Sequence, residues 1–173
     1  MSNLVKISST TVTQDSTSAV TLLGIDSTYD VYKVVGTNVC PTTDDKDFYF
    51  RVCASDTPQT TSNYNTSTKN LRVDTTFSNS ALDGYDKFFI GSAVGSNGGE
   101  TSNFVIYLFG FNDSSSNSFI TIEHVQSVYD LTLFGLQGGG VYKVDEAHNG
   151  VNFTWESSDT FHSGTITLYG LKK

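Results

Sequence analysis

Short runs in which apolar and polar residues alternate recur along the chain, and they constrain its fold more than any other feature. In residues 119–125, for example, Ile120 and Ile122 alternate with Thr121 and Glu123. A period of two is typical of a strand with one face on a core and the other toward water. We therefore predict strands at residues 19–24, 29–39, 48–54, 104–111, 119–125, 131–136, 141–144, 151–155 and 165–171.

Helix-forming residues are too scarce for a helical protein. The 173 residues include one Met, and the only glutamates are Glu100, Glu123, Glu146 and Glu156. A chain of this length is expected to form one domain. We predict an all-β fold, a single antiparallel β-sandwich domain over residues 1–173, with residues 1–16 as an extended N-terminal arm.

Clusters rich in Gly, Ser, Asn and Asp separate the predicted strands. Those at residues 95–99, 113–117 and 137–140 are predicted to be turns. Residues 55–103 are more polar, and we interpret them as long connections with one or two short strands. A helical turn near residues 79–87 is an alternative for part of that segment.

The charge of the chain argues against nucleic acid as a partner, and its N-terminal sequence argues against export. The net charge is −8, and the only cluster of basic residues is Lys172 with Lys173, so binding to nucleic acid is not expected. The N-terminus lacks a basic segment followed by an apolar one. No apolar run reaches the roughly 18 residues that span a membrane. We expect a chain made in the cytoplasm, without a signal peptide and without membrane contact.

The two cysteines are predicted to be free. If residues 29–39 and 47–54 form a hairpin, Cys40 lies at its turn and Cys53 at the far end of its second strand. The Cα atoms of a disulfide lie within about 7 Å of each other, which this register does not allow. Both cysteines are then small apolar residues of the interior.

No arrangement of residues predicts an enzyme. Serines are abundant, but none lies in a Gly-x-Ser-x-Gly motif, and the only histidines are His124, His148 and His162. His124 has the strand parity of Ile120 and Ile122, which predicts a partly buried, hydrogen-bonded side chain. The aspartates likewise show no spacing that singles out a glycosidase pair.

Metal and cofactor sites are also not predicted. The histidines lack a His-x-x-x-His spacing and no Cys-x-x-Cys is present, so zinc is not expected. Asp44, Asp45 and Asp47 offer oxygen ligands for a hard cation but lack the pattern of an EF-hand loop. A solvated turn is the preferred interpretation, with cation binding left open.

Tyrosines on polar faces of strands are the candidates for recognition, because such rings are common at protein interfaces. They are Tyr49, Tyr107, Tyr129, Tyr142 and Tyr169.

Residues 104–111 are apolar on both faces. One parity holds Phe104, Ile106 and Leu108, and the other holds Val105, Tyr107, Phe109 and Phe111. A sandwich core accommodates only one of these faces. The second face requires cover from residues 55–100 or from a neighbouring copy, and we favour a homotrimer in which a copy provides it.

Several segments resemble small virion proteins of tailed marine bacteriophages. They are residues 24–35, 50–52, 104–112, 118–123, 137–140 and 163–172. The resemblance implies a jelly-roll-like sandwich, commonly trimeric, that resides in the virion. It implies a non-enzymatic capsid decoration (cement) protein that binds the major capsid protein on the outer surface of the phage head and stabilises it. The alternative is a tail-fibre or receptor-binding domain that recognises host surface glycans.

Overall fold

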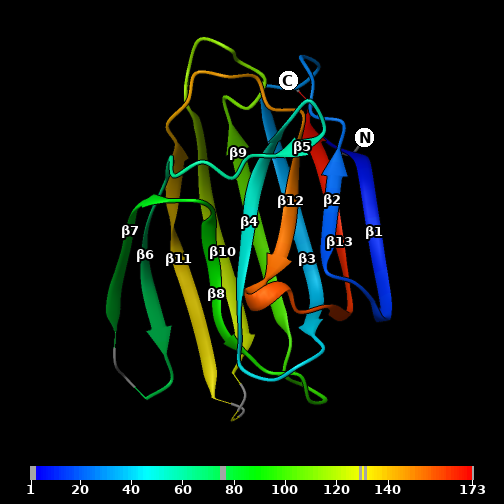
Figure 1. Cartoon of the computed structure of the whole chain (residues 1–173), viewed down its shortest axis with the longest axis vertical. Helices are drawn as coiled ribbons and strands as arrows, with labels where there is room; N and C mark the ends of the chain where they lie inside the picture. The colour runs from blue at the N-terminus through cyan, green and yellow to red at the C-terminus, as the bar shows by residue number, and fades with distance from the viewer. Residues whose placement is uncertain (1–2, 75–76, 129, 131, 173) are drawn as a thin grey trace.

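The chain folds into two antiparallel β-sheets packed face to face (Figure 1), as seen in a computed structural model that describes residues 3–74, 77–128, 130 and 132–172. The strands are β1 Leu4–Thr17, β2 Ala19–Leu23, β3 Val31–Pro41, β4 Lys46–Ala54, β5 Thr57–Pro58, β6 Tyr64–Arg72, β7 Ser78–Tyr85, β8 Phe88–Val94, β9 Ser102–Phe109, β10 Ser118–Ser127, β11 Leu133–Tyr142, β12 Gly150–Trp155 and β13 Phe161–Leu171. The described residues contain one 3-10 turn, η1 Glu156–Ser158, and no α-helix. The predicted all-β, antiparallel fold is confirmed.

The two sheets differ in width. The larger has eight strands in the order β1-β13-β3-β9-β10-β11-β6-β7. The smaller has five strands: the order β2-β12-β4-β5, with β8 also paired to β4. The smaller sheet therefore covers one face of the larger sheet, which we call the inner face, and the opposite face is the outer face.

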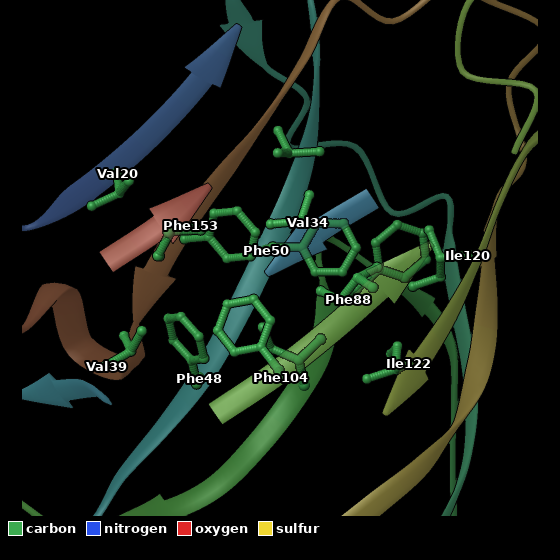
Figure 2. Packing of buried hydrophobic residues seen from close by; sticks show 14 of the residues in the cluster. Val20, Val34, Val39, Phe48, Phe50, Phe88, Phe104, Ile120, Ile122 and Phe153 are labelled. Atoms are coloured by element: carbon green, nitrogen blue, oxygen red, sulfur yellow. The ribbon is translucent and has the colours of Figure 1, made fainter. Parts of the chain in front are cut away.

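The core lies between the sheets and is dominated by aromatic rings (Figure 2). Phe104, from the larger sheet, lies with its ring centroid 5.6 Å from those of both Phe48 and Phe153, which come from the smaller sheet. Such offset ring packing fills a thick interior with rigid side chains. The alternation that predicted β10 is confirmed, because Ile120 and Ile122 are buried in this core while Thr121 and Glu123 face outward.

The predicted turn at residues 137–140 is wrong. These residues lie inside β11, which joins the two strands predicted at 131–136 and 141–144 and ends at Tyr142. Their glycines are explained by crowding rather than by a turn. A Cβ atom at Gly139 would lie 2.7 Å from the carbonyl oxygen of Ile120, and one at Gly140 would lie 2.6 Å from that of Asn65. Both carbonyls belong to the strands that flank β11.

The interpretation of residues 55–103 and of the N-terminal arm is also wrong. Residues 4–17 form β1, paired with β13 at the edge of the larger sheet. Residues 64–94 form β6, β7 and β8, and β7 occupies the segment where a helical turn was an alternative. These strands escaped prediction because β1 and β7 are edge strands largely in contact with solvent. They carry Ser, Thr and Asn instead of an apolar alternation.

The predicted hairpin of β3 and β4 does not form, because the two strands belong to different sheets. The prediction that both cysteines are free is confirmed, although the predicted hairpin is wrong: Cys40 and Cys53 are both free and buried. Burial raises the pKa of the Cys40 thiol to about 11 and that of Cys53 to about 12, which keeps both protonated.

Candidate functional site

His124 is hydrogen-bonded, as predicted, but it is buried more deeply than the predicted partly buried side chain, and its Nδ1 has no hydrogen-bond partner among the described residues. Its Nε2 lies 2.7 Å from the Oγ of Ser102, and both side chains face the interior of the sandwich. Burial lowers the pKa of His124 to about 3, so the ring is neutral at physiological pH. Because Ser102 has no exposed surface, this pair has no access to a substrate.

A second buried pair joins β10 to the loop before β12. The Nδ1 of His148 lies 2.8 Å from the Oγ of Ser118, and a carboxylate oxygen of Glu146 lies 3.7 Å from its Nε2. Ser, His and Glu in this order resemble a hydrolase triad. However, Ser118 and His148 are both fully buried, so the hydroxyl cannot reach a substrate carbonyl. Burial also lowers the pKa of His148 to about 4.

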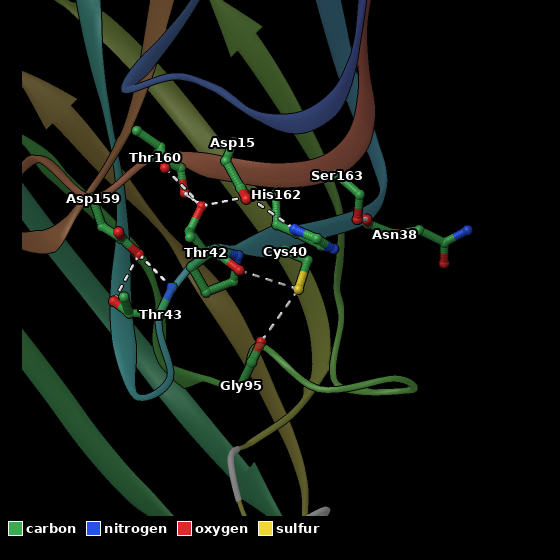
Figure 3. A network of polar contacts seen from close by, with 11 residues as sticks. Asp15, Asn38, Cys40, Thr42, Thr43, Gly95, Asp159, Thr160, His162 and Ser163 are labelled. Carbon is green, nitrogen blue, oxygen red and sulfur yellow. Dashed lines mark hydrogen bonds and ion pairs between the residues drawn. The ribbon is translucent and has the colours of Figure 1, made fainter.

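His162 belongs to an exposed network that ties the end of β1 to neighbouring segments (Figure 3). Its Nδ1 lies 2.8 Å from a carboxylate oxygen of Asp15, and Thr42 donates a hydroxyl hydrogen bond of 2.8 Å to the same oxygen. These two hydrogen bonds lower the pKa of Asp15. Asp15 has a positive φ of 48°, so the network holds an irregular segment of β1 in place.

The aspartates of the β3–β4 loop bind backbone groups. Asp44 accepts a hydrogen bond of 3.0 Å from the backbone N–H of Ser96, and Asp47 accepts one of 3.2 Å from that of Ala93. Across the described ranges, no group of three or more His, Cys, Asp or Glu side chains is placed to hold a metal ion. The loop is a hydrogen-bonded turn at one end of the sandwich. We call its surroundings the acidic end: they hold Asp15, Asp44, Asp45, Asp47, Glu156 and Asp159, with one lysine, Lys46, among them.

The five candidate tyrosines separate into different environments. Tyr107 and Tyr169 lie half-buried on the outer face of the larger sheet. Tyr49 lies on the smaller sheet, with the Nζ of Lys87 4.4 Å from its ring centroid. Tyr142 is buried against Tyr64, so its assignment to a recognition surface is wrong. Tyr129 lies outside the described residues.

The outer face carries a row of residues that the sequence did not reveal. Lys6 pairs with Tyr169, Tyr169 with Lys33, and Lys33 with Tyr107, one residue from each of β1, β13, β3 and β9. We call this the lysine–tyrosine row. The Nζ of Lys33 lies 5.5 Å from the ring centroid of Tyr107, within range of a cation–π contact. Only the strand order brings these four positions together, since they are far apart in the sequence.

A second region of the outer face is apolar and hollowed. Val125, Gly135 and Leu71 pair across β10, β11 and β6, and the missing side chain of Gly135 leaves a depression between its neighbours. Exposed fractions are 39% for Leu71, 62% for Val73, 46% for Val125 and 52% for Leu133. We call these four side chains, with the floor at Gly135, the apolar groove. Cavities of about 250 and 390 Å³ meet at Val125.

The described residues between 55 and 100 do not cover this face. β6 and β7 extend the larger sheet sideways, and β8 belongs to the smaller sheet on the opposite side. The outer side chains of β9, from Val105 to Phe109, therefore remain in contact with solvent, whereas Phe111 lies beyond the strand and is buried.

Comparisons with protein-family models, with curated proteins and with solved structures find no match to this chain. In the described part of the chain, no helix is long and apolar enough to cross a membrane.

Proposed function

We propose that this chain is a non-enzymatic structural protein of a virion, a decoration (cement) protein that binds the outer surface of a phage head. The observation that carries the proposal is the apolar groove on an uncovered sheet face. Contiguous exposed apolar side chains on a soluble protein typically mark a site of interaction. The resemblance to small virion proteins suggests the capsid as the surface that is bound.

The outer face is large enough for such an interaction. Eight strands at about 4.8 Å spacing make it roughly 34 Å wide, and a stable interface needs about 800 Å² from each partner. Leu133 and Val125, which protrude beside the groove, are the anchors expected to contribute most. Burying them against a capsid subunit provides affinity without any catalytic group.

We further propose that the sandwich is a jelly-roll variant. In a jelly roll, a long hairpin of paired strands is rolled up, so early strands pair with late ones. In this chain β1 pairs with β13, β2 with β12, and β4 with β8. This nested pairing supports the assignment.

Binding to purified phage heads that lack the chain tests the proposal. Wild-type protein is expected to co-sediment with the heads, and Leu133→Asp is expected to bind at least tenfold more weakly, since it places a charge in the buried part of the contact. Thr121→Asp is the matched control, because it adds the same charge at an exposed position on the same face. Absence of wild-type binding, or equal loss in both variants, contradicts the proposal.

A receptor-binding domain of a tail fibre is the second candidate. It is favoured by the lysine–tyrosine row, because tyrosine rings on a flat face can stack against sugars of host glycans. Copy number in purified particles separates the two functions. A decoration protein is expected in numbers comparable to the major capsid protein, and a tail protein in far fewer copies.

A further inference from the structure

Charge is divided unevenly between two surfaces of this chain. All 18 carboxylates belong to described residues, yet none occupies a paired position on β1, β13, β3 or β9. These four strands carry the lysine–tyrosine row. Beside the row, along the strands, lie the outward side chains of Val31, Val35, Val105 and Phe109. Within these four strands the outer face is therefore positive and apolar, in a chain of net charge −8, and Glu123 of β10 faces outward beside Val105 at its border.

The acidic end has the opposite character and is held in a fixed arrangement. Asp159 accepts two hydrogen bonds of 2.9 Å from the backbone N–H and the hydroxyl of Thr43, and Asp44 accepts one from Ser96. Asp15 is held by Thr42 and His162 (Figure 3). Because the protein itself orders these carboxylates, a cationic partner finds them without a large further loss of side-chain entropy.

We propose that the lysine–tyrosine row of one copy docks on the acidic end of a second copy. The ammonium groups of Lys6 and Lys33 would lie against Asp44, Asp159 and neighbouring carboxylates. The rings of Tyr107 and Tyr169 and the side chains beside them would lose contact with water. This contact uses strands β1, β13, β3 and β9, not the apolar groove on β10, β11 and β6, so it is independent of the proposed function.

The pairing is heterologous, with two different surfaces in contact. A symmetric contact of one outer face with another would place lysines against lysines, which is unfavourable. A contact between the row and the acidic end can close as a two-fold dimer, in which the row of each copy lies on the acidic end of the other, or as a larger ring, or it can continue as an open filament. The face of a sheet and the ends of its strands point in perpendicular directions, so each contact turns the chain. This favours a small ring over a straight filament.

Sedimentation velocity of the purified chain at micromolar concentration tests the contact. Wild-type protein is expected to form a dimer or larger closed oligomer at low salt and to dissociate at high salt, because the contact depends on exposed charges. Two variants each alter one surface: Lys6→Glu with Lys33→Glu reverses the row, and Asp44→Lys, Asp45→Lys, Glu156→Lys and Asp159→Lys together reverse the acidic end, where only Asp15 and Asp47 then remain acidic. Each variant alone is expected to associate at least tenfold more weakly.

Mixing the two variants is the decisive measurement. The reversed row of the first variant complements the reversed end of the second, and their unchanged surfaces also complement each other. Association should therefore return in the mixture, in species with an even number of copies in which the two variants alternate. Asp145→Lys, an exposed reversal at the opposite end of the sandwich, is the matched control and should associate like wild type. Unchanged urea-unfolding midpoints confirm that each variant is folded.

Three results would overturn the proposal. The first is a monomeric wild-type chain at low salt. The second is association that neither set of reversals weakens. The third is failure of the mixture to recover, which would show that the row and the acidic end do not contact each other.

Discussion

The two faces of β9 carry nearly the same amount of apolar surface but have different environments. Phe104, Ile106 and Leu108 point inward and are buried, whereas Tyr107 and Phe109 point outward, and Phe109 is 36% exposed. Apolar character therefore does not by itself determine which residues stabilise the fold. The inward side chains stabilise the sandwich because the smaller sheet covers them, while the outward ones are available to a partner. Four predictions test this division between the faces.

The largest loss of stability is expected for a substitution on the inner face. Phe104→Ala should lower the free energy of unfolding by about 3–5 kcal/mol, since it removes a ring packed between Phe48 and Phe153 and leaves a cavity. Urea unfolding measures the change as a shift in midpoint at constant slope. A loss below about 1 kcal/mol would show that the core relaxes around the missing ring, contrary to our description.

A smaller loss of stability is expected when an inner-face glycine of β11 is replaced. Gly140→Ala should cost about 1–3 kcal/mol, because the added Cβ would lie 2.6 Å from the Asn65 carbonyl oxygen and 2.8 Å from the Phe88 ring. Gly98→Ala is the matched control, since nothing lies within 4 Å of its Cβ position. Equal unfolding midpoints for the two variants would contradict the crowding explanation.

Acid should destabilise the fold through the buried histidines. Burial holds the pKa of His124 at about 3 and that of His148 at about 4, against about 6.5 in the unfolded chain. The two neutral histidines contribute their full share of the unfolding free energy at a pH above about 6.5, the pKa of a histidine in the unfolded chain. This share is lost as the pH falls toward their lower pKa values in the folded chain, because over that range only the unfolded chain takes up protons. Between about pH 6 and pH 5 the two histidines together should lower the free energy of unfolding by about 2 kcal/mol.

Unfolding free energy measured across this pH range checks the prediction. His148→Gln should roughly halve the pH dependence, even if the variant is less stable at neutral pH. His162→Gln, which changes a half-exposed histidine, is the control and should retain the dependence on His124 and His148. A flat profile between about pH 6 and pH 5 in the wild-type protein would refute burial of neutral rings.

The smallest effect on stability is expected on the outer face. Phe109→Asp should change the free energy of unfolding by no more than about 0.5 kcal/mol, since its side chain contacts solvent. The same variant should weaken self-association, because Phe109 lies beside the lysine–tyrosine row. A monomeric wild-type protein whose solubility Phe109→Asp leaves unchanged would remove the reason for assigning this face to assembly.

Alternation in the sequence predicted the strands that border the core, such as β9 and β10, because burial on one face leaves a period of two. It could not predict β1 or β7, whose exposed edges require no apolar residues. The glycines at 138–140 were misjudged because glycine marks turns and crowded strands alike, and only the neighbouring carbonyls distinguish the two. The lysine–tyrosine row required the order of four strands, which depends on long-range pairing.

The nested pairing of the strands also has a consequence for the timing of folding. Among the described strands, β1 pairs with β13 alone and β2 with β12 alone, so neither can pair until these strands, distant in the sequence, have been synthesised. Contacts between residues so far apart in sequence form slowly, because a long loop must close before they contribute. Truncation before β12 would leave both N-terminal strands without partners. The domain is therefore expected to complete its fold only after β12 and β13 have been synthesised.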